Sequence, residues 1–96
     1  MRLATVCGQV VSTAKDPGLG RFTLLLLRDA PGATAPADPV PYVAVDLIGA
    51  GTGEVVLVVA GGGARVAAGT DVPTDRAVVA IVDSVVEEGS VTYSKA

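Results

Sequence analysis

The chain has 96 residues and a mass of 9.5 kDa, enough for one small domain and too little for separate catalytic and regulatory halves. It has no histidine and one cysteine, which excludes the commonest imidazole base, an intrachain disulfide and a thiolate zinc cluster. Ten acidic against seven basic residues give a net charge of −3, so the chain lacks the basic surface that nucleic-acid binding needs.

Valine, alanine and glycine together make up 45 of the 96 residues. Valine favours the half-buried surface of a pleated sheet, and glycine marks turns and close approaches of the backbone, so an all-β protein is expected. The first residues contain no apolar stretch long enough for a signal peptide. No run reaches the roughly 18–20 apolar residues of a membrane span, and we therefore expect a soluble cytoplasmic protein.

Five or six short strands are expected, separated by turns rich in glycine and proline. They span residues 3–12, 22–28, 42–48, 54–60, 80–86 and 91–94. Gly8, inside the first strand, predicts a bulge or bend. Thr74 and Asp75 are expected to cap a single short helical turn over residues 76–78. This spacing favours a small barrel or sandwich with a C-terminal strand.

Two connections between these strands differ in composition. Residues 15–18 read Lys-Asp-Pro-Gly, which is a turn sequence. Residues 30–41 hold four of the six prolines among alanines, which predicts an irregular surface loop. Nothing repeats internally, and a single domain over residues 1–96 is expected.

Three segments inside the expected strands are apolar at every position. They are residues 24–27, 55–59 and 80–82. In an antiparallel sheet with one wet face, apolar and polar residues alternate instead. Because the chain has no long helix to cover a second face, identical neighbours are the simplest cover, and closed homo-oligomers are the usual result.

The segment from Gly49 to Gly53 (GAGTG) has the composition of a phosphate-binding loop. Such loops lead from a strand into the N-terminus of a helix, whereas this one leads into the apolar strand at residues 55–59. A tight connection, or close packing near a symmetry axis, is the favoured interpretation.

A second glycine run, residues 61–63, precedes Ala64 and Arg65. Backbone amides in such a run can bind an anion, with Arg65 supplying positive charge. We favour a flexible loop in which Arg65 makes a backbone or intersubunit hydrogen bond.

Asp46 and Asp83 each interrupt an apolar run, and two neighbouring carboxylates can act as an acid/base pair. The chain is too small for a deep cleft and has no tryptophan platform. The favoured interpretation is an acid at a strand end that accepts backbone N–H bonds or meets an arginine. Cys7 has no cationic or histidine neighbour to activate its thiol, and we expect a small packing residue there.

Three collinear segments resemble the bacterial microcompartment vertex proteins, the EutN/CcmL family. They are residues 8–17 (GQVVSTAKDP) with the leucines at 24–27, residues 43–57 (VAVDLIGAGTGEVVL) and residues 73–85 (PTDRAVVAIVDSV). The match covers nearly the whole chain in order. One departure lies at residues 61–65, where the family commonly has Gly-Ser-x-Ala-Arg and this chain reads Gly-Gly-Gly-Ala-Arg. Arg65 is retained and the serine hydroxyl is missing.

The resemblance implies a five-stranded barrel related to the OB-fold and a structural role without cofactors or a reaction. It implies a ring of five copies at the corners of a polyhedral protein shell, beside hexameric and trimeric shell proteins and around metabolic enzymes. Gly49, Ala50 and Gly51 are then expected at the five-fold axis or a subunit contact. Arg65 and Asp83 are expected to contact a neighbouring subunit or tile.

Two functions of other classes remain open from the sequence. An OB-like barrel can bind single-stranded nucleic acid or another ligand, although nucleic-acid binding needs a basic groove and stacking aromatics that this composition lacks. The other is a small acid-catalysed enzyme that uses Asp46 and Asp83.

Overall fold

A computed structural model describes residues 1–29 and 40–95 of the chain. The elements within them are β1 (Arg2–Val10), the 3-10 helix η1 (Pro17–Leu19), β2 (Thr23–Asp29), β3 (Tyr42–Asp46), β4 (Val55–Ala60), α1 (Gly62–Ala68), β5 (Arg76–Ile81), β6 (Ser84–Glu87) and β7 (Ser90–Ser94). Most of the proline-rich segment 30–41, the predicted surface loop, lies outside the described residues. No helix among the residues described is both long and apolar enough to cross a membrane.

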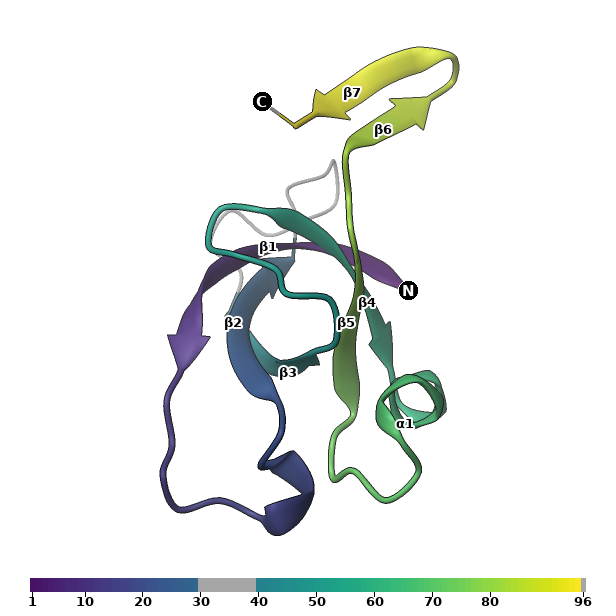
Figure 1. The fold of residues 1–96 in the computed structure, drawn as a ribbon. Coiled ribbons are helices and arrows are strands. Elements are labelled where there is room, and N and C mark those ends of the chain that lie inside the picture. Colours follow the sequence, from purple (N-terminus) through teal and green to yellow (C-terminus); the bar gives the residue numbers. More distant parts are fainter. Residues whose placement is uncertain (30–39, 96) are drawn as a thin grey trace.

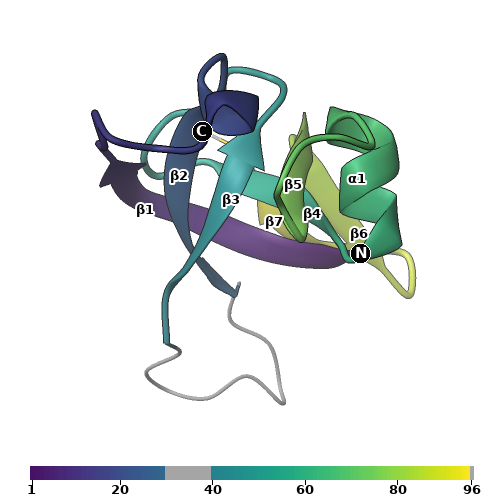
Figure 2. The same ribbon diagram turned by 90° about the horizontal axis from the view of Figure 1, so that it is seen from below.

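Five strands close into a barrel in the order β1-β2-β3-β5-β4, and β6 and β7 form a separate hairpin (Figures 1 and 2). Neighbouring strands of the barrel are antiparallel except β3 and β5, which pair in parallel over two positions, Val45 with Ala77 and Asp46 with Val78. The expected five-stranded barrel is confirmed. The hairpin projects from one end and lengthens the molecule to 44 Å, against 24 Å across.

β1 closes the barrel because it pairs with β2 along one edge and with β4 along the other. Its register with β2 shifts between Val6 and Gly8, which is the bulge predicted at this glycine. A bulge bends its strand and increases the local twist, and a small barrel needs both to close.

The barrel interior is filled by small and medium aliphatic side chains. They are Ala4, Val6, Leu25, Leu27, Ala44, Val56, Val58 and Val78. The interior of a five-stranded barrel is narrow, which explains why valine and alanine dominate it. Burial of each valine or leucine contributes about 1.5–3 kcal/mol by removing its side chain from water.

The helix lies elsewhere than the sequence predicted. Residues 76–78 are strand, because Arg76 pairs with Ala60 of β4 and the pairing continues along β5. The Thr74 hydroxyl accepts from the Arg76 amide and donates to the Arg76 carbonyl, so it organises a turn before a strand instead of capping a helix. The helical residues are Gly62–Ala68, where we expected a flexible loop.

α1 forms because it covers part of the barrel's outer surface. Ala64 and Ala68, one helical turn apart, are buried against Val45, Val72 and Ala77 in a second apolar cluster. Tertiary packing of this kind overrides the low helix propensity of two leading glycines. No long helix was expected to cover a second face, and this seven-residue helix covers only one corner of the barrel.

The strand expected at residues 80–86 is two strands. Val82 still donates its amide to the Val55 carbonyl, at the start of β4. Beyond that point β4 offers no further partner, and the chain leaves the barrel at Asp83 to form β6. β6 then pairs with β7 across a turn at Glu88 and Gly89, both with positive φ.

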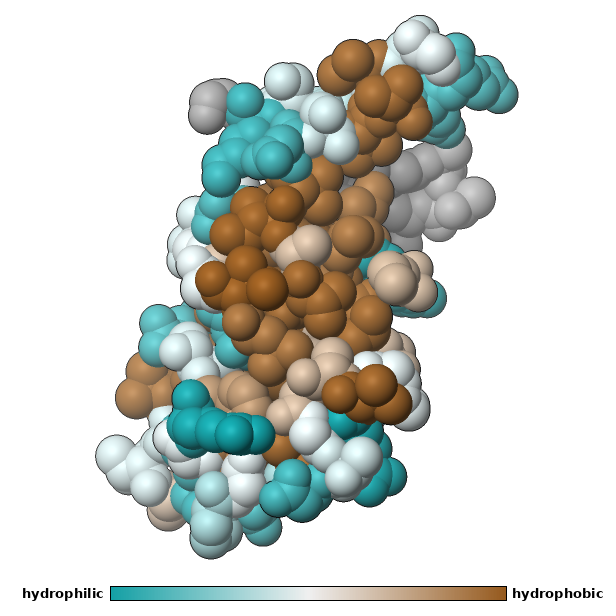
Figure 3. Space-filling view, turned by 45° about the vertical axis from the view of Figure 1, so that its right-hand side comes forward, coloured by the Kyte–Doolittle hydropathy of each residue, from teal (hydrophilic) through white to brown (hydrophobic). Residues whose placement is uncertain are grey.

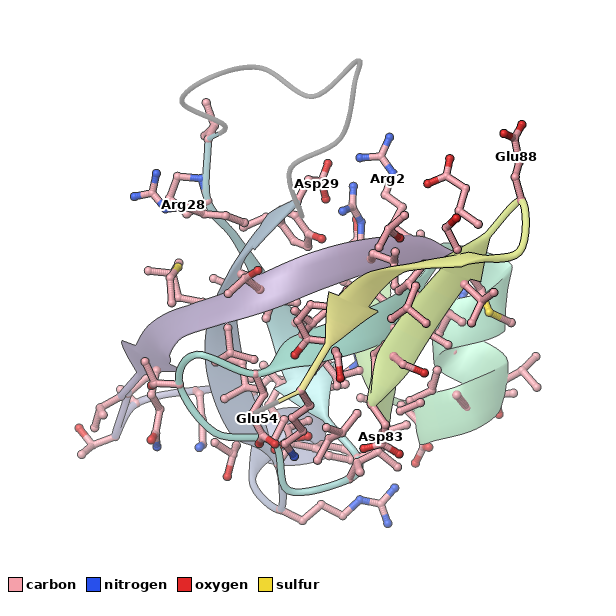
Figure 4. All side chains as sticks on the ribbon, turned by 90° about the horizontal axis from the view of Figure 1, so that it is seen from above. Arg2, Arg28, Asp29, Glu54, Asp83 and Glu88 are labelled. Atoms are coloured by element: carbon pink, nitrogen blue, oxygen red, sulfur yellow. The ribbon has the colours of Figure 1, made fainter. Side chains whose placement is uncertain are left out.

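A polar network joins four strands at one end of the barrel. Asp29 accepts from Arg2 Nη1 at 2.6 Å and from the Tyr42 hydroxyl at 2.9 Å, and the Arg76 guanidinium stacks 4.6 Å from the Tyr42 ring centroid. Burial, and then the hydrogen bond to Asp29, raise the pKa of Tyr42 to about 12. Figure 4 shows Arg2 and Asp29 beside each other above β1.

The outer surface of β1, β4 and β5 remains apolar. Leu3 pairs with Leu57, and Leu57 pairs on its other side with Ala80, so these side chains stand together outside the barrel with Val55. All four are half-buried and belong to neither buried cluster. We call them the outer strip. For β4 and β5, the strip bears out the prediction that residues 55–59 and 80–82 are apolar on both faces of the sheet.

Candidate functional site

The connection between β3 and β4 is organised by Asp46. Its carboxylate accepts from the backbone amides of Ile48, Gly49 and Ala50 at 3.0–3.1 Å. The favoured interpretation of Asp46, a strand-end acid that binds backbone N–H groups, is confirmed. Both carboxylate oxygens are used in these bonds, which gives the residue a structural role.

The Gly49–Gly53 loop then returns to the barrel. Gly49 and Gly53 both have φ of +92°, a conformation that favours glycine, while Ala50 is half-buried against the barrel core. The Gly53 amide donates to the Val6 carbonyl at 2.8 Å, which holds the end of the loop against β1. The loop leads into β4, so it is a connection between strands, as expected.

Glu54 links this loop to the C-terminal hairpin. Glu54 Oε1 accepts from the Gly51 amide at 2.6 Å, and Glu54 Oε2 pairs with Lys95 Nζ at 2.7 Å. The Lys95 amide donates to the Asp83 carbonyl at 2.8 Å. Lys95 thereby joins the loop at Gly51 to the strand exit at Asp83, two separate predicted contact regions. No local pattern in the sequence predicts the Glu54–Lys95 pair, because 41 residues separate its members.

We call the Glu54–Lys95 ion pair, together with the hydrogen bond from the Lys95 amide to the Asp83 carbonyl, the latch. Within the latch, Glu54 and Lys95 each stabilise the charged form of the other. The hydrogen bond from Lys95, and then that from the Gly51 amide, lower the pKa of Glu54, and the bond to Glu54 raises the pKa of Lys95. A carboxyl whose pKa is lowered by folding stabilises the fold above its ordinary pKa and loses that contribution as the pH falls. The ion pair is exposed, so its contribution to global stability is small.

Acidification is therefore expected to release the hairpin before the barrel unfolds. As the pH falls below 4.5 and through the lowered pKa of Glu54, the Lys95 amide should lose protection from hydrogen exchange. The readout is exchange at Lys95, corrected for intrinsic rate, with barrel amides as the internal reference. In Glu54→Gln the Lys95 amide should be unprotected already at neutral pH. Equal protection in both proteins at neutral pH would contradict the latch.

Gly49 and Gly51 differ in what the single chain demands of them. A Cβ on Gly51 would lie 3.5 Å from Glu54 Oε1, which is ordinary contact, whereas Gly49 has open space but positive φ. The positive φ therefore requires glycine at position 49. At position 51, nothing within the same chain requires glycine.

Because of this difference, variants at the two glycines can distinguish an effect on folding from an effect on assembly. Gly49→Ala should cost the barrel about 1–2 kcal/mol, because L-residues avoid that conformation. Gly51→Leu should leave the unfolding of the isolated chain nearly unchanged and weaken the ring if the loop meets a neighbour. Chemical unfolding and native mass spectrometry of the two variants measure these effects. An unchanged oligomer with Gly51→Leu would make the loop an ordinary surface turn.

Arg65 lies on α1 and is exposed. Its Nη2 donates to the Thr70 carbonyl at 3.0 Å, so the expected backbone hydrogen bond is found within the same chain. The glycines at 61–63 do not form an anion-binding loop, since residues 62 and 63 belong to a seven-residue helix. Arg65 borders a shallow hollow with the segment 70–74.

Cys7 is exposed at the bulge of β1, and its Sγ donates to the Leu26 carbonyl at 3.3 Å. The prediction of a packing residue is wrong within the single chain, because side chains alternate along β1 and Cys7 follows the inward-facing Val6. Within residues 1–29 and 40–95, no three His, Cys, Asp or Glu side chains gather as a metal site would require.

Known proteins match this chain along almost its whole length. The family model described as "Ethanolamine utilisation protein EutN/carboxysome" matches residues 1–83. The bacterial microcompartment shell vertex protein EutN of Salmonella typhimurium is 45% identical over 98 residues, covering 99% of this chain and 96% of that protein. The chain belongs to the EutN/CcmL family of microcompartment shell vertex proteins. The carboxysome shell vertex protein CcmL of Thermosynechococcus vestitus is 44% identical, with 99% and 96% of the two chains covered.

Solved structures of EutN/CcmL proteins have the same fold. EutN from Escherichia coli superposes with a TM-score of 0.83 at 42% identity, over the full length of both chains. The pentameric microcompartment shell protein GrpN from Rhodospirillum rubrum has a TM-score of 0.77 at 41% identity, covering 88% of this chain and 96% of that one. The protein is thus a structural component of a microcompartment or carboxysome shell and not an enzyme, as the resemblance implied.

Proposed function

We propose that five copies of this chain form a ring that closes the corners of a polyhedral shell around metabolic enzymes. The observation that carries the proposal is the full-length match to shell vertex proteins, among them GrpN, which is described as pentameric. A second pentameric shell protein, from the RMM microcompartment, matches 86% of this chain at 30% identity.

The geometry of a closed shell requires such a unit. A layer of hexagonal tiles is flat, and it closes into a polyhedron only where a five-fold unit replaces a tile. The partners in this role are hexameric and trimeric shell proteins, which contact the rim of the ring. Polar groups at such a rim set orientation more than affinity.

Co-expression with hexameric and trimeric microcompartment shell proteins tests this function. With the vertex protein present, electron microscopy should show closed polyhedra, and without it open or extended assemblies. Equal closure in both preparations would contradict the role at the corners.

Arg65 is our candidate for a rim contact. It is exposed, and a guanidinium with one nitrogen on Thr70 retains donors for a carbonyl or carboxylate of a neighbour. Arg65→Ala is expected to leave the ring intact and the shells open at their corners. Broken rings would assign Arg65 to the contact between subunits, and normal closed shells would remove it from both contacts. Lys15→Ala, another exposed cation, is the matched control.

A further inference from the structure

One end of the barrel carries a cluster of positive charge. Figure 3 shows a continuous hydrophobic area along the side of the barrel, so that side offers few partners to a charged ligand. At the end where β1 begins, the polar network around Asp29 contains Arg2 and Arg76. Arg28, the residue before Asp29 on β2, adds a third arginine at this end (Figure 4). Asp75, next to Arg76 in the sequence, lines a hollow that none of these residues borders. Three arginines and one aspartate give this end a charge of +2, whereas the chain as a whole carries −3.

The four residues of this network lie over one end of the barrel interior. Side chains alternate along a strand, so a residue two positions from an interior residue points to the same side of the sheet. Each network residue is separated in this way from an interior residue of its own strand: Arg2 from Ala4, Asp29 from Leu27, Tyr42 from Ala44 and Arg76 from Val78. We call the four network residues the mouth cluster.

The mouth cluster presents hydrogen-bond donors that its own members do not use. Both oxygens of Asp29 are occupied, one by Arg2 and the other by the Tyr42 hydroxyl. The Arg76 guanidinium lies 4.6 Å from the Tyr42 ring centroid, and its nitrogen atoms hydrogen-bond to no residue within 1–29 and 40–95. A guanidinium carries five N–H donors, and Arg2 uses one of its nitrogens on Asp29. Two arginines therefore have donors left for a ligand.

Tyr42 contributes its ring to the mouth cluster and adds no charge. Its hydroxyl keeps its proton at neutral pH, because burial, and then the hydrogen bond to Asp29, raise its pKa to about 12. Arg2 and Arg76 both act in the opposite direction on this pKa, so both positive charges lie near the same hydroxyl. The stack on the ring orients the Arg76 guanidinium and leaves the edge of its plane for a ligand.

We propose that the mouth cluster binds the phosphate group of a small molecule, held by the guanidinium groups of Arg76 and Arg2. Guanidinium groups match phosphate oxygens in pairs, and hydrogen bonds between charged groups are among the strongest in proteins. A phosphate monoester carries about 1.5 to 2 negative charges at neutral pH and three acceptor oxygens, which match the charge of this end and its two arginines. Asp29 holds Arg2 in position through their 2.6 Å bond. All of these residues belong to one chain, so the site does not depend on how many copies form the ring.

The test is an NMR titration of the isotope-labelled protein with inorganic phosphate at neutral pH, with sodium chloride holding the ionic strength constant. The side-chain Nε–H resonances of Arg76 and Arg2 should shift and saturate, because they report on the two guanidinium groups. Arg76→Gln keeps a polar side chain without the charge, and it should raise the phosphate concentration of half-saturation at Arg2 by about tenfold. Acetate, with one charge and two oxygens, should need about tenfold more than phosphate in the wild type.

Asp29→Asn distinguishes a binding site from a network that only stabilises the barrel. The change removes the one negative charge of the mouth cluster, while the side-chain oxygen can still accept from the Tyr42 hydroxyl. Phosphate should then bind more tightly, with the concentration of half-saturation lowered by about threefold or more. A network with only a structural role predicts no gain in affinity from the loss of its ion pair.

Lys15→Gln is the matched control, because it removes an exposed cation that lies outside the mouth cluster, and it should leave phosphate binding unchanged. A shift that does not saturate, or equal half-saturation in Arg76→Gln and wild type, would overturn the site. Equal half-saturation by acetate and phosphate would overturn phosphate as the ligand. Should Arg76→Gln fail to fold, Arg2→Gln takes its place with Arg76 as the reporter, since the Arg2 side chain is 62% exposed.

Discussion

Replacement of Leu27 by alanine is expected to lower the free energy of unfolding by about 3–5 kcal/mol. Leu27 is fully buried in the barrel interior, where the shell of strands around it cannot collapse into the space that its side chain leaves. Domains of this size are stable by about 5–15 kcal/mol, so the variant should lose a large part of its stability. Urea unfolding at a fixed protomer concentration measures the change.

Thr23→Ala, at the exposed start of the same strand, is the control and should cost less than about 0.5 kcal/mol. Similar costs for the two variants would mean that β2 does not present Leu27 to a closed interior, which would contradict the barrel.

Replacement of Asp46 by alanine is expected to have the second largest effect, about 1–3 kcal/mol, because three backbone amides lose a charged acceptor at once. The same change should loosen the Gly49–Gly53 loop, and hydrogen exchange at Gly49 and Ala50 should rise. If the loop meets a neighbour in the ring, the variant also assembles more weakly than its stability alone explains.

Asp46→Asn separates geometry from charge. Its side-chain oxygen still accepts from Ile48 and Gly49, whereas its amide nitrogen would face the Ala50 amide without bonding to it. The expected order of stability is wild type, then asparagine, then alanine. An alanine variant as stable as wild type would show that water satisfies these amides equally well.

The sequence predicted β1 to β4 within two residues at each end, because each one combines β-branched residues with flanking turn residues. β5 begins at Arg76, four residues before the strand expected at 80–86. The expected strand at 42–48 ends at Asp46, two residues early, since its carboxylate binds the backbone that follows. Alternation alone did not show which apolar face was interior. That assignment depends on closure of the barrel, through the bulge between Val6 and Gly8 and the parallel pairing of β3 with β5.

The helix was misplaced because local signals and tertiary packing disagree. Thr74 and Asp75 have the residue types of a helix cap, yet Arg76 pairs with β4, and three glycines precede a helix that Ala64 and Ala68 anchor. The four-residue spacing of those alanines was the one signal in the sequence, and it is weak next to a glycine run.

Of the predicted contact residues, the structure places Gly51 and Asp83 close to the same lysine and sets Arg65 on a separate helix. The positive φ explains the glycine at 49, whereas nothing within the single chain requires glycine at 51. The apolar strand segments predicted that a neighbour covers them, but one sequence carries no pattern that shows which residues of the neighbour they meet.

Native mass spectrometry of the purified protein at micromolar concentration measures how many copies of the chain assemble. We expect a dominant species of five chains, five times 9.5 kDa or 47.5 kDa, which dissociates by ejection of single chains when activated. A protein that is only monomeric or dimeric under these conditions would contradict it.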